Sequence, residues 1–112
     1  EAIQSELEAF AEERDWNQFH SPKNLAMALS VEVSELLEHF QWLTQEQSTQ
    51  LDAKTLESVA TEIADIQIDL LRLADKLGID IESAIDLKMQ DNERKDPADR
   101  VRGSAAKYTE YD

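Results

Sequence analysis

The sequence predicts an all-α protein, a four-helix bundle-like fold. Only two glycines and two prolines occur among 112 residues, so tight turns are few. Apolar residues recur at spacings of three and four along most of the chain, which is the period of an amphipathic helix. The length suits one compact domain. We expect residues 1–97 to form that domain and residues 98–112 to form a polar tail that contacts a neighbouring subunit.

The first two helices are expected on either side of an aromatic segment. Residues 1–14 form the first, because apolar side chains recur there at helical spacing. Residues 15–22 interrupt that pattern, and Ser21-Pro22 is a strong helix-start signal with proline at the first helical position. The second helix is expected from about Pro22 to Trp42. Its apolar stripe consists of Leu25, Leu29, Val33, Leu36 and Phe40.

The third and fourth helices are separated by a glycine. The third is expected over about Ala53–Leu77, and it carries apolar residues on more than one side, as a helix packed on several faces would. Gly78 is a good stop signal, and Asp80 is a good cap for a fourth helix over about residues 81–95. The main stripe of the third helix consists of Val59, Ile63, Ile66, Leu70 and Leu73.

The net charge of −14 limits the partners of this chain. Such a field repels the backbone of nucleic-acid polymers, and it repels a nucleoside triphosphate unless metal ions accompany the phosphates. There is no cysteine, which excludes disulfides and thiolate metal sites. No apolar run approaches the length of a membrane span, and the first residues do not resemble a signal peptide. We expect a cytoplasmic protein that binds no membrane.

Two pairs of acidic residues stand out, each with its members three positions apart: Glu32-x-x-Glu35 and Glu62-x-x-Asp65. We call these pairs the acidic steps. Their spacing alone is uninformative, because 25 of 112 residues are acidic and such pairs arise by chance. Their surroundings are informative, since both steps lie beside long apolar stripes and far from helix ends. Four carboxylates in one pocket would suit a divalent cation. A solvated helix face explains the same pattern.

Aromatic and basic side chains provide the other candidates. Trp16, Phe19 and Trp42 bracket the second helix, and together with His20 they can form a stacking platform for a base or simply anchor loops. A polar group at the end of the fourth helix can contact phosphates or complement the charge of the helix terminus. It consists of Lys88, Asn92, Arg94 and Lys95.

With these segments in place, the chain resembles the MazG-type all-α nucleoside triphosphate pyrophosphohydrolases, and among them the dCTP pyrophosphatase-like branch. Residues 10–20 (FAEERDWNQFH), the run Glu32-Val33-Ser34-Glu35 and the run Glu62-Ile63-Ala64-Asp65 carry this resemblance. The segments Pro22–Leu25, Phe40–Trp42, Lys88-Met89 with Asn92 and Arg94, and Lys107–Glu110 complete it. One departure is Arg94-Lys95-Asp96-Pro97, where the family often has Arg-Tyr-Pro.

The resemblance implies Mg²⁺-dependent hydrolysis of deoxynucleoside triphosphates, cytosine forms among them, to a monophosphate and pyrophosphate. It implies a house-cleaning role in the nucleotide pool and a homo-oligomer, for which we expect a tetramer. The implied metal ligands and catalytic residues are Glu32, Glu35, Glu62 and Asp65. The implied substrate contacts are Trp16, His20, Trp42, Lys88 and Asn92. The alternative is a non-catalytic acidic helical module that binds partner proteins.

Overall fold

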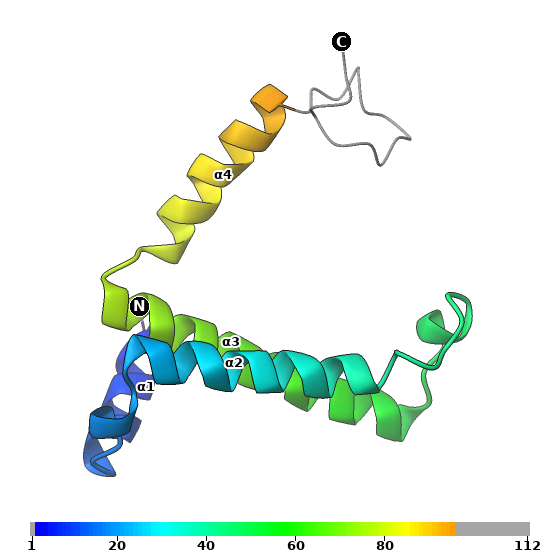
Figure 1. Ribbon diagram of the computed structural model, residues 1–112, viewed down its shortest axis with the longest axis horizontal. Coiled ribbons are helices and arrows are strands. Elements are labelled where there is room, and N and C mark those ends of the chain that lie inside the picture. The colour runs from blue at the N-terminus through cyan, green and yellow to red at the C-terminus, as the bar shows by residue number, and fades with distance from the viewer. Residues whose placement is uncertain (1, 96–112) are drawn as a thin grey trace. The chain divides into compact units, whose positions relative to one another are not determined.

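The computed structural model describes residues 2–95, in which every regular element is helical (Figure 1). The α-helices are α1 (Ala2–Glu13), α2 (Pro22–Glu38), α3 (Ala53–Leu77) and α4 (Ile81–Lys95). Two short 3₁₀ helices, η1 (Asn17–Phe19) and η2 (Gln47–Thr49), lie in the connections. The prediction of an all-α chain with four helices is therefore confirmed. The predicted tail at residues 98–112 lies outside the described residues.

Side-chain caps fix the helix boundaries. The Ser21 hydroxyl accepts a hydrogen bond from the backbone N–H of Asn24 at 3.1 Å at the start of α2, and the carboxylate of Asp80 accepts one from the N–H of Ser83 at 3.2 Å at the start of α4. Gly78 ends α3 with φ 67°, a left-handed conformation that glycine adopts without strain.

The second helix is shorter than predicted. The sequence pattern predicted a helix to Trp42, but α2 ends at Glu38. The backbone N–H groups of His39 and Phe40 donate to the carbonyls of Leu36 at 3.2 Å and Leu37 at 2.9 Å. These bonds span three residues rather than four, so the chain tightens into turns before Trp42.

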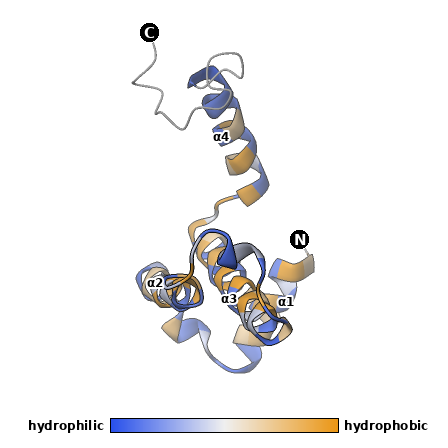
Figure 2. Cartoon of the chain, turned by 90° about the vertical axis from the view of Figure 1, so that its right-hand side faces the viewer, coloured by the Kyte–Doolittle hydropathy of each residue, from blue (hydrophilic) through white to orange (hydrophobic). Residues whose placement is uncertain are grey.

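The chain divides into two compact units, the first ending at Gly78 and the second beginning at Ile79. Within the first unit α2 and α3 run antiparallel and adjacent, and α1 packs against α3 (Figure 1). Figure 2 shows α2 and α3 nearly end-on with α1 beside α3, and apolar and polar residues on each of the three helices. In the described part of the chain, the buried apolar side chains are Ala11, Leu25, Val59 and Ala74.

Three residues that the sequence pattern placed in core-facing stripes are instead exposed. Val33 is 47% exposed, Ile63 is 53% exposed and Leu70 is 38% exposed. Half-buried carboxylates occupy part of the surfaces where α2 and α3 face each other. Part of each apolar stripe therefore faces solvent. Over residues 2–95, no helix has the length and apolar character needed to cross a membrane.

Candidate metal centre

The antiparallel pair of helices brings three of the predicted ligands together. Glu32 and Glu35 lie on α2, and Glu62 lies on α3. One carboxylate oxygen from each lies within 4.8 Å of the others. All three side chains are half-buried. Residues three apart share a helix face, so the first two carboxylates point together toward the third. Oxygen ligands at this spacing suit a hard divalent cation.

The cluster contains polar atoms that lack partners. The Oε2 atoms of Glu32 and Glu62 are buried and have no hydrogen-bond partner among the described residues. An anionic oxygen that is removed from water without a donor or cation carries a large free-energy cost. A bound cation would supply the missing partner to both oxygens at once. The residues present therefore fit a divalent metal ion.

Like charges and burial shift the acid–base behaviour of the cluster. The pKa of Glu32 is raised to about 7, first by burial and then by the negative charges of Glu35 and Asp65. The pKa of Glu62 is also raised, first by burial, then by a hydrogen-bonded contact with the carboxyl of Glu35, with Asp65 adding charge and His39 acting in the opposite direction. Asp65, the fourth predicted ligand, therefore lies close enough to repel both glutamates.

Without metal, the protein should lose stability as the pH rises from about 4.5 to about 7. A carboxyl whose pKa is raised by folding binds its proton more tightly in the folded state, so its contribution is full below the unfolded pKa and disappears above the folded pKa of about 7. Melting temperatures measured in EDTA across this range should show the decline, and Glu32→Gln should flatten it. Equal slopes for wild type and variant would contradict this assignment.

Sequence reasoning missed two side chains on the same face of α3. Asp69 follows Asp65 by one turn, and its pKa is raised first by burial and then by the charge of Asp65, while His20 lowers it. Arg72 lies one turn further and is only 3% exposed. The position of Asp69 beside the acidic step was a usable signal. No comparable signal marked Arg72, because arginine is rarely buried to this extent.

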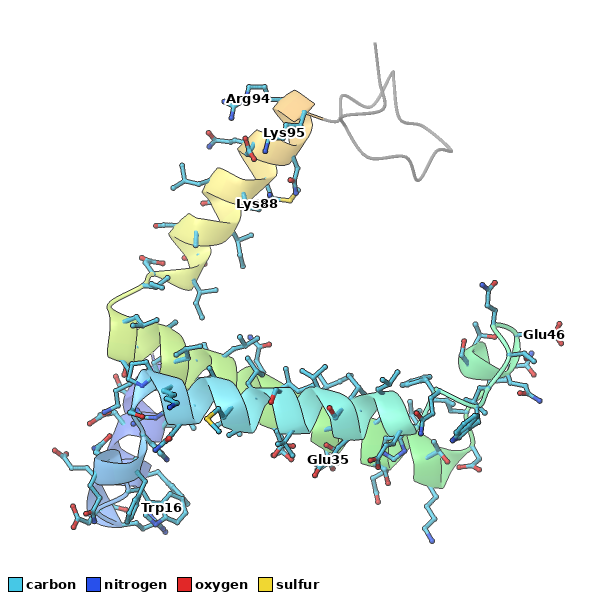
Figure 3. The ribbon with its side chains drawn as sticks, in the orientation of Figure 1. Trp16, Glu35, Glu46, Lys88, Arg94 and Lys95 are labelled. Atoms are coloured by element: carbon cyan, nitrogen blue, oxygen red, sulfur yellow. The ribbon has the colours of Figure 1, made fainter. Side chains whose placement is uncertain are left out.

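The aromatic segment between α1 and α2 gathers two of the predicted base contacts. The Trp16 ring centroid lies 5.5 Å from that of Phe10 in an edge-to-face arrangement and 6.4 Å from the His20 ring. The Arg14 guanidinium lies 3.6 Å from the Phe10 ring centroid. Trp16 remains 42% exposed, so part of its ring is accessible to a ligand. In Figure 3 the side chains of Trp16 and Glu35 both lie below the α2–α3 pair.

The remaining substrate contacts stay predictions. Trp42 is 86% exposed on the turn that follows α2. Lys88 and Asn92 are exposed residues of α4, which belongs to the second compact unit. The Lys88 ammonium lies 3.8 Å from the carboxylate of Asp91, which also pairs with Arg94 and Lys95. Contacts with Lys95 and Arg94 lower the pKa of Asp91, so the basic group is organised around this carboxylate.

Known proteins share much of this sequence. Residues 27–111 match the MazG-like family. The chain is 45% identical over 103 residues to dCTP pyrophosphatase 1 of Bos taurus and 44% identical to that of Homo sapiens, in each case over 90% of this chain. It spans 61% of the length of these relatives.

A solved structure extends the comparison to the fold. A pyrophosphatase from Archaeoglobus fulgidus superposes with a TM-score of 0.77 at 40% identity, over 86% of this chain and 90% of that chain. The family match covers most of the sequence, including both acidic steps, and the structural match covers most of both chains. With its all-α fold and its cluster of carboxylates between α2 and α3, the chain belongs to the MazG-like family.

Proposed function

We propose that this protein hydrolyses nucleoside triphosphates to a nucleoside monophosphate and pyrophosphate with the help of Mg²⁺. The observation that carries the proposal is the carboxylate cluster of Glu32, Glu35 and Glu62, with its two buried oxygens that lack partners. The relatives that are called dCTP pyrophosphatase 1 and the archaeal pyrophosphatase support the same reaction. Glu32, Glu35, Glu62 and Asp65 would hold Mg²⁺, and Mn²⁺ can replace it.

The chain's own residues provide binding and proton transfer. When bound, Mg²⁺ offsets the charge of the triphosphate and makes water a better nucleophile. Hydrolysis breaks the α–β phosphoanhydride bond, and a carboxylate of the cluster accepts the proton of the attacking water. Lys88 and Asn92 contact the phosphates in this proposal.

The base is held by aromatic side chains in the same proposal. Trp16, His20 and Trp42 present rings that can stack on a base, and Trp16 and Trp42 are exposed. Stacking tolerates any base, since every base has a π-face. The relatives' name favours dCTP and other deoxynucleotides as substrates. Removal of unwanted nucleotides from the pool follows as the biological role.

A substrate panel tests this proposal. The four dNTPs, the four NTPs and modified forms of dCTP should be compared by pyrophosphate release in the presence of Mg²⁺. We expect the highest kcat/KM among the deoxynucleotides, with dCTP or its modified forms in the lead. Equal rates for ribonucleotides and deoxynucleotides would refute the sugar preference, and no release from any of them would refute the activity.

A homo-oligomer is the second part of the proposal, and an apolar stripe along α3 supports it. Seven residues are nearly two helical turns, so residues at this spacing share one side of a helix. The stripe consists of Leu56, Ile63, Leu70 and Leu77, which are 57%, 53%, 38% and 53% exposed. At about 100° per residue it points away from Asp65 and Asp69.

A second copy of the chain is the occupant that fits this stripe. Val33 and Leu37 of α2, the helix that packs on α3, are 47% and 57% exposed and add further exposed apolar side chains. Exposed apolar surface of this kind marks an interaction site, and heptad spacing suits packing against another helix. Two copies related by a twofold axis would present the same stripe to each other. A tetramer would be a dimer of such dimers.

Placing a charge on the stripe should dissociate the oligomer. Ile63→Lys would bury an ammonium group in an apolar contact, which costs more than the contact gains. Light scattering at micromolar concentration should report an oligomer for the wild type and a monomer for this variant. Glu57→Lys, an exposed site on the same helix, is the control and should keep the wild-type mass. A monomeric wild type would contradict the proposal.

A further inference from the structure

Arg72 is a buried cation that joins three elements of the first compact unit. Its side chain is 4% exposed and lies on α3, two turns beyond Asp65. Nη1 donates a hydrogen bond to Oε1 of Glu8 on α1 at 2.7 Å. Nη2 donates to Oδ1 of Asn17 in η1 at 2.7 Å. A single guanidinium therefore ties both α1 and the aromatic segment to the helix that carries Glu62.

The contacts around Arg72 form a closed network. Asn17 Oδ1 also accepts a hydrogen bond from the Lys76 ammonium at 2.8 Å, and Asn17 Nδ2 donates to Oε2 of Glu8 at 3.1 Å. Arg72 Nη2 lies 3.4 Å from Nδ1 of His20. The pKa of His20 is lowered, first by burial and then by the positive charges of Arg72 and Lys76, which keeps the imidazole neutral beside the guanidinium.

The segment held by this network is short, and it has further restraints: the Trp16 ring packs edge-to-face on Phe10, and the Phe19 carbonyl accepts a hydrogen bond from Nδ2 of Asn24 at 3.1 Å. Asp15 adopts a positive φ of 56°, and the backbone N–H of Trp16 donates to the carbonyl of Ala11 at 2.9 Å. Trp16 immediately precedes Asn17, so the backbone that carries its ring is directly joined to the anchored residue. Trp16 and His20 thus flank η1, and Arg72 contacts Asn17, the first residue of η1, and His20, which follows its last residue.

Stability alone does not explain a buried arginine at this position. Nε of Arg72 is buried and has no hydrogen-bond partner among the described residues. Apolar residues of similar size often replace buried ion pairs without loss of stability. The carboxylate of Glu8 is 40% exposed, so water can solvate it if the guanidinium is removed. Arg72→Met should therefore fold, with the helices intact.

We propose that Arg72 is a positioning residue that fixes the segment from Trp16 to His20 against α3, at a set distance from the carboxylate cluster, and so determines the apparent affinity for the base of the nucleotide. The kinetic part of this inference rests on the proposed function. Arg72 acts through Trp16 and His20 and contacts no reacting atom.

The restraint itself can be measured without substrate. In a Trp42→Phe background, Trp16 is the only tryptophan, so its fluorescence reports on the segment. Arg72→Met should raise the acrylamide quenching constant of Trp16 about twofold, because the segment loses its anchor, while far-UV circular dichroism stays unchanged. Gln18→Ala is the matched control within η1, since Gln18 contacts only Asp15 in the described network. Unchanged quenching in Arg72→Met would overturn the proposal.

Kinetics then separate positioning from catalysis. In the otherwise wild-type protein, Arg72→Met should raise KM for dCTP about tenfold and leave kcat within about threefold, since base binding is lost and the chemical step is not. The rise in melting temperature caused by Mg²⁺ should remain. Arg72→Lys, which keeps a cation at this site, should recover part of the loss. Asn17→Ala removes the amide that accepts the hydrogen bond of Arg72 and leaves the arginine in place. It should reproduce the rise in KM, which keeps the test valid if Arg72→Met fails to fold.

The outcomes distinguish this inference from the proposed function. An unchanged KM together with a loosened Trp16 would overturn the positioning role, as would a fall in kcat at constant KM. Absence of pyrophosphate in the wild-type reaction would instead overturn the proposed function. That measurement uses the wild-type protein alone, so the two failures can be told apart.

Discussion

Glu62→Gln should reduce pyrophosphate release from dCTP by at least about a hundredfold, because it removes a proposed ligand of the Mg²⁺ ion that would offset the negative charge of the triphosphate. Nucleotide binding should fall much less, since the base and phosphate contacts remain. Steady-state kinetics with Mg²⁺, combined with tryptophan fluorescence on addition of dCTP and Mg²⁺, measure both quantities. Glutamine keeps the size of the side chain, so the fold should be retained.

Glu38→Gln is the matched control for this prediction. Glu38 follows Glu35 by the same spacing of three residues on α2, but its side chain is exposed. It should keep wild-type turnover. Full activity in Glu62→Gln, or an equal loss in both variants, would show that the cluster of half-buried carboxylates is not the catalytic centre.

Mg²⁺ should raise the melting temperature of the wild-type protein by several degrees. A cation that binds only the folded state stabilises it by mass action, by about 2.7 kcal/mol at a hundred times its dissociation constant. It also offsets the negative charge of the cluster, in which burial first, and then the charges of Glu35 and Asp65, raise the pKa of Glu32 to about 7. Differential scanning calorimetry in Mg²⁺ and in EDTA measures the effect.

Variants of the cluster should remove this response in a characteristic way. Glu32→Gln should abolish the Mg²⁺-dependent rise, and in EDTA at pH 8 it should melt above the wild type, because it eliminates a repelled charge. Asp65→Asn should also lose the Mg²⁺ response. A wild-type protein whose melting temperature ignores Mg²⁺ and Mn²⁺ would contradict the metal-site assignment.

The helices, and the position of each acidic step on its helix, could be predicted because local rules determine them. Ser21-Pro22, Gly78 and Asp80 mark helix ends through caps and backbone geometry that depend on a few neighbouring residues. The position of Glu32 and Glu62 beside apolar stripes depends only on helical periodicity. The structure places both residues in one cluster, as the pattern predicted.

Features that depend on distant contacts could not be predicted in the same way. The hydrogen bonds of Arg72 join residues 55 and 64 positions apart, and no local pattern encodes them. The exposure of Ile63 and Leu70 depends on which side of α3 faces α2. Helical periodicity predicts that these residues form an apolar stripe, but it does not identify the helix that packs against that stripe. Lys88 and Asn92 remain candidates for the same reason, because their link to the metal site depends on tertiary structure rather than on spacing.

Phosphorus NMR of the products tests the central claim most directly. Wild-type protein incubated with dCTP and Mg²⁺ should convert the three triphosphate resonances into those of dCMP and pyrophosphate in equal amounts, with no dCDP and no orthophosphate. EDTA should stop the conversion, because the carboxylate cluster then repels the triphosphate. Unchanged dCTP, or a product mixture of dCDP and orthophosphate, would contradict the account.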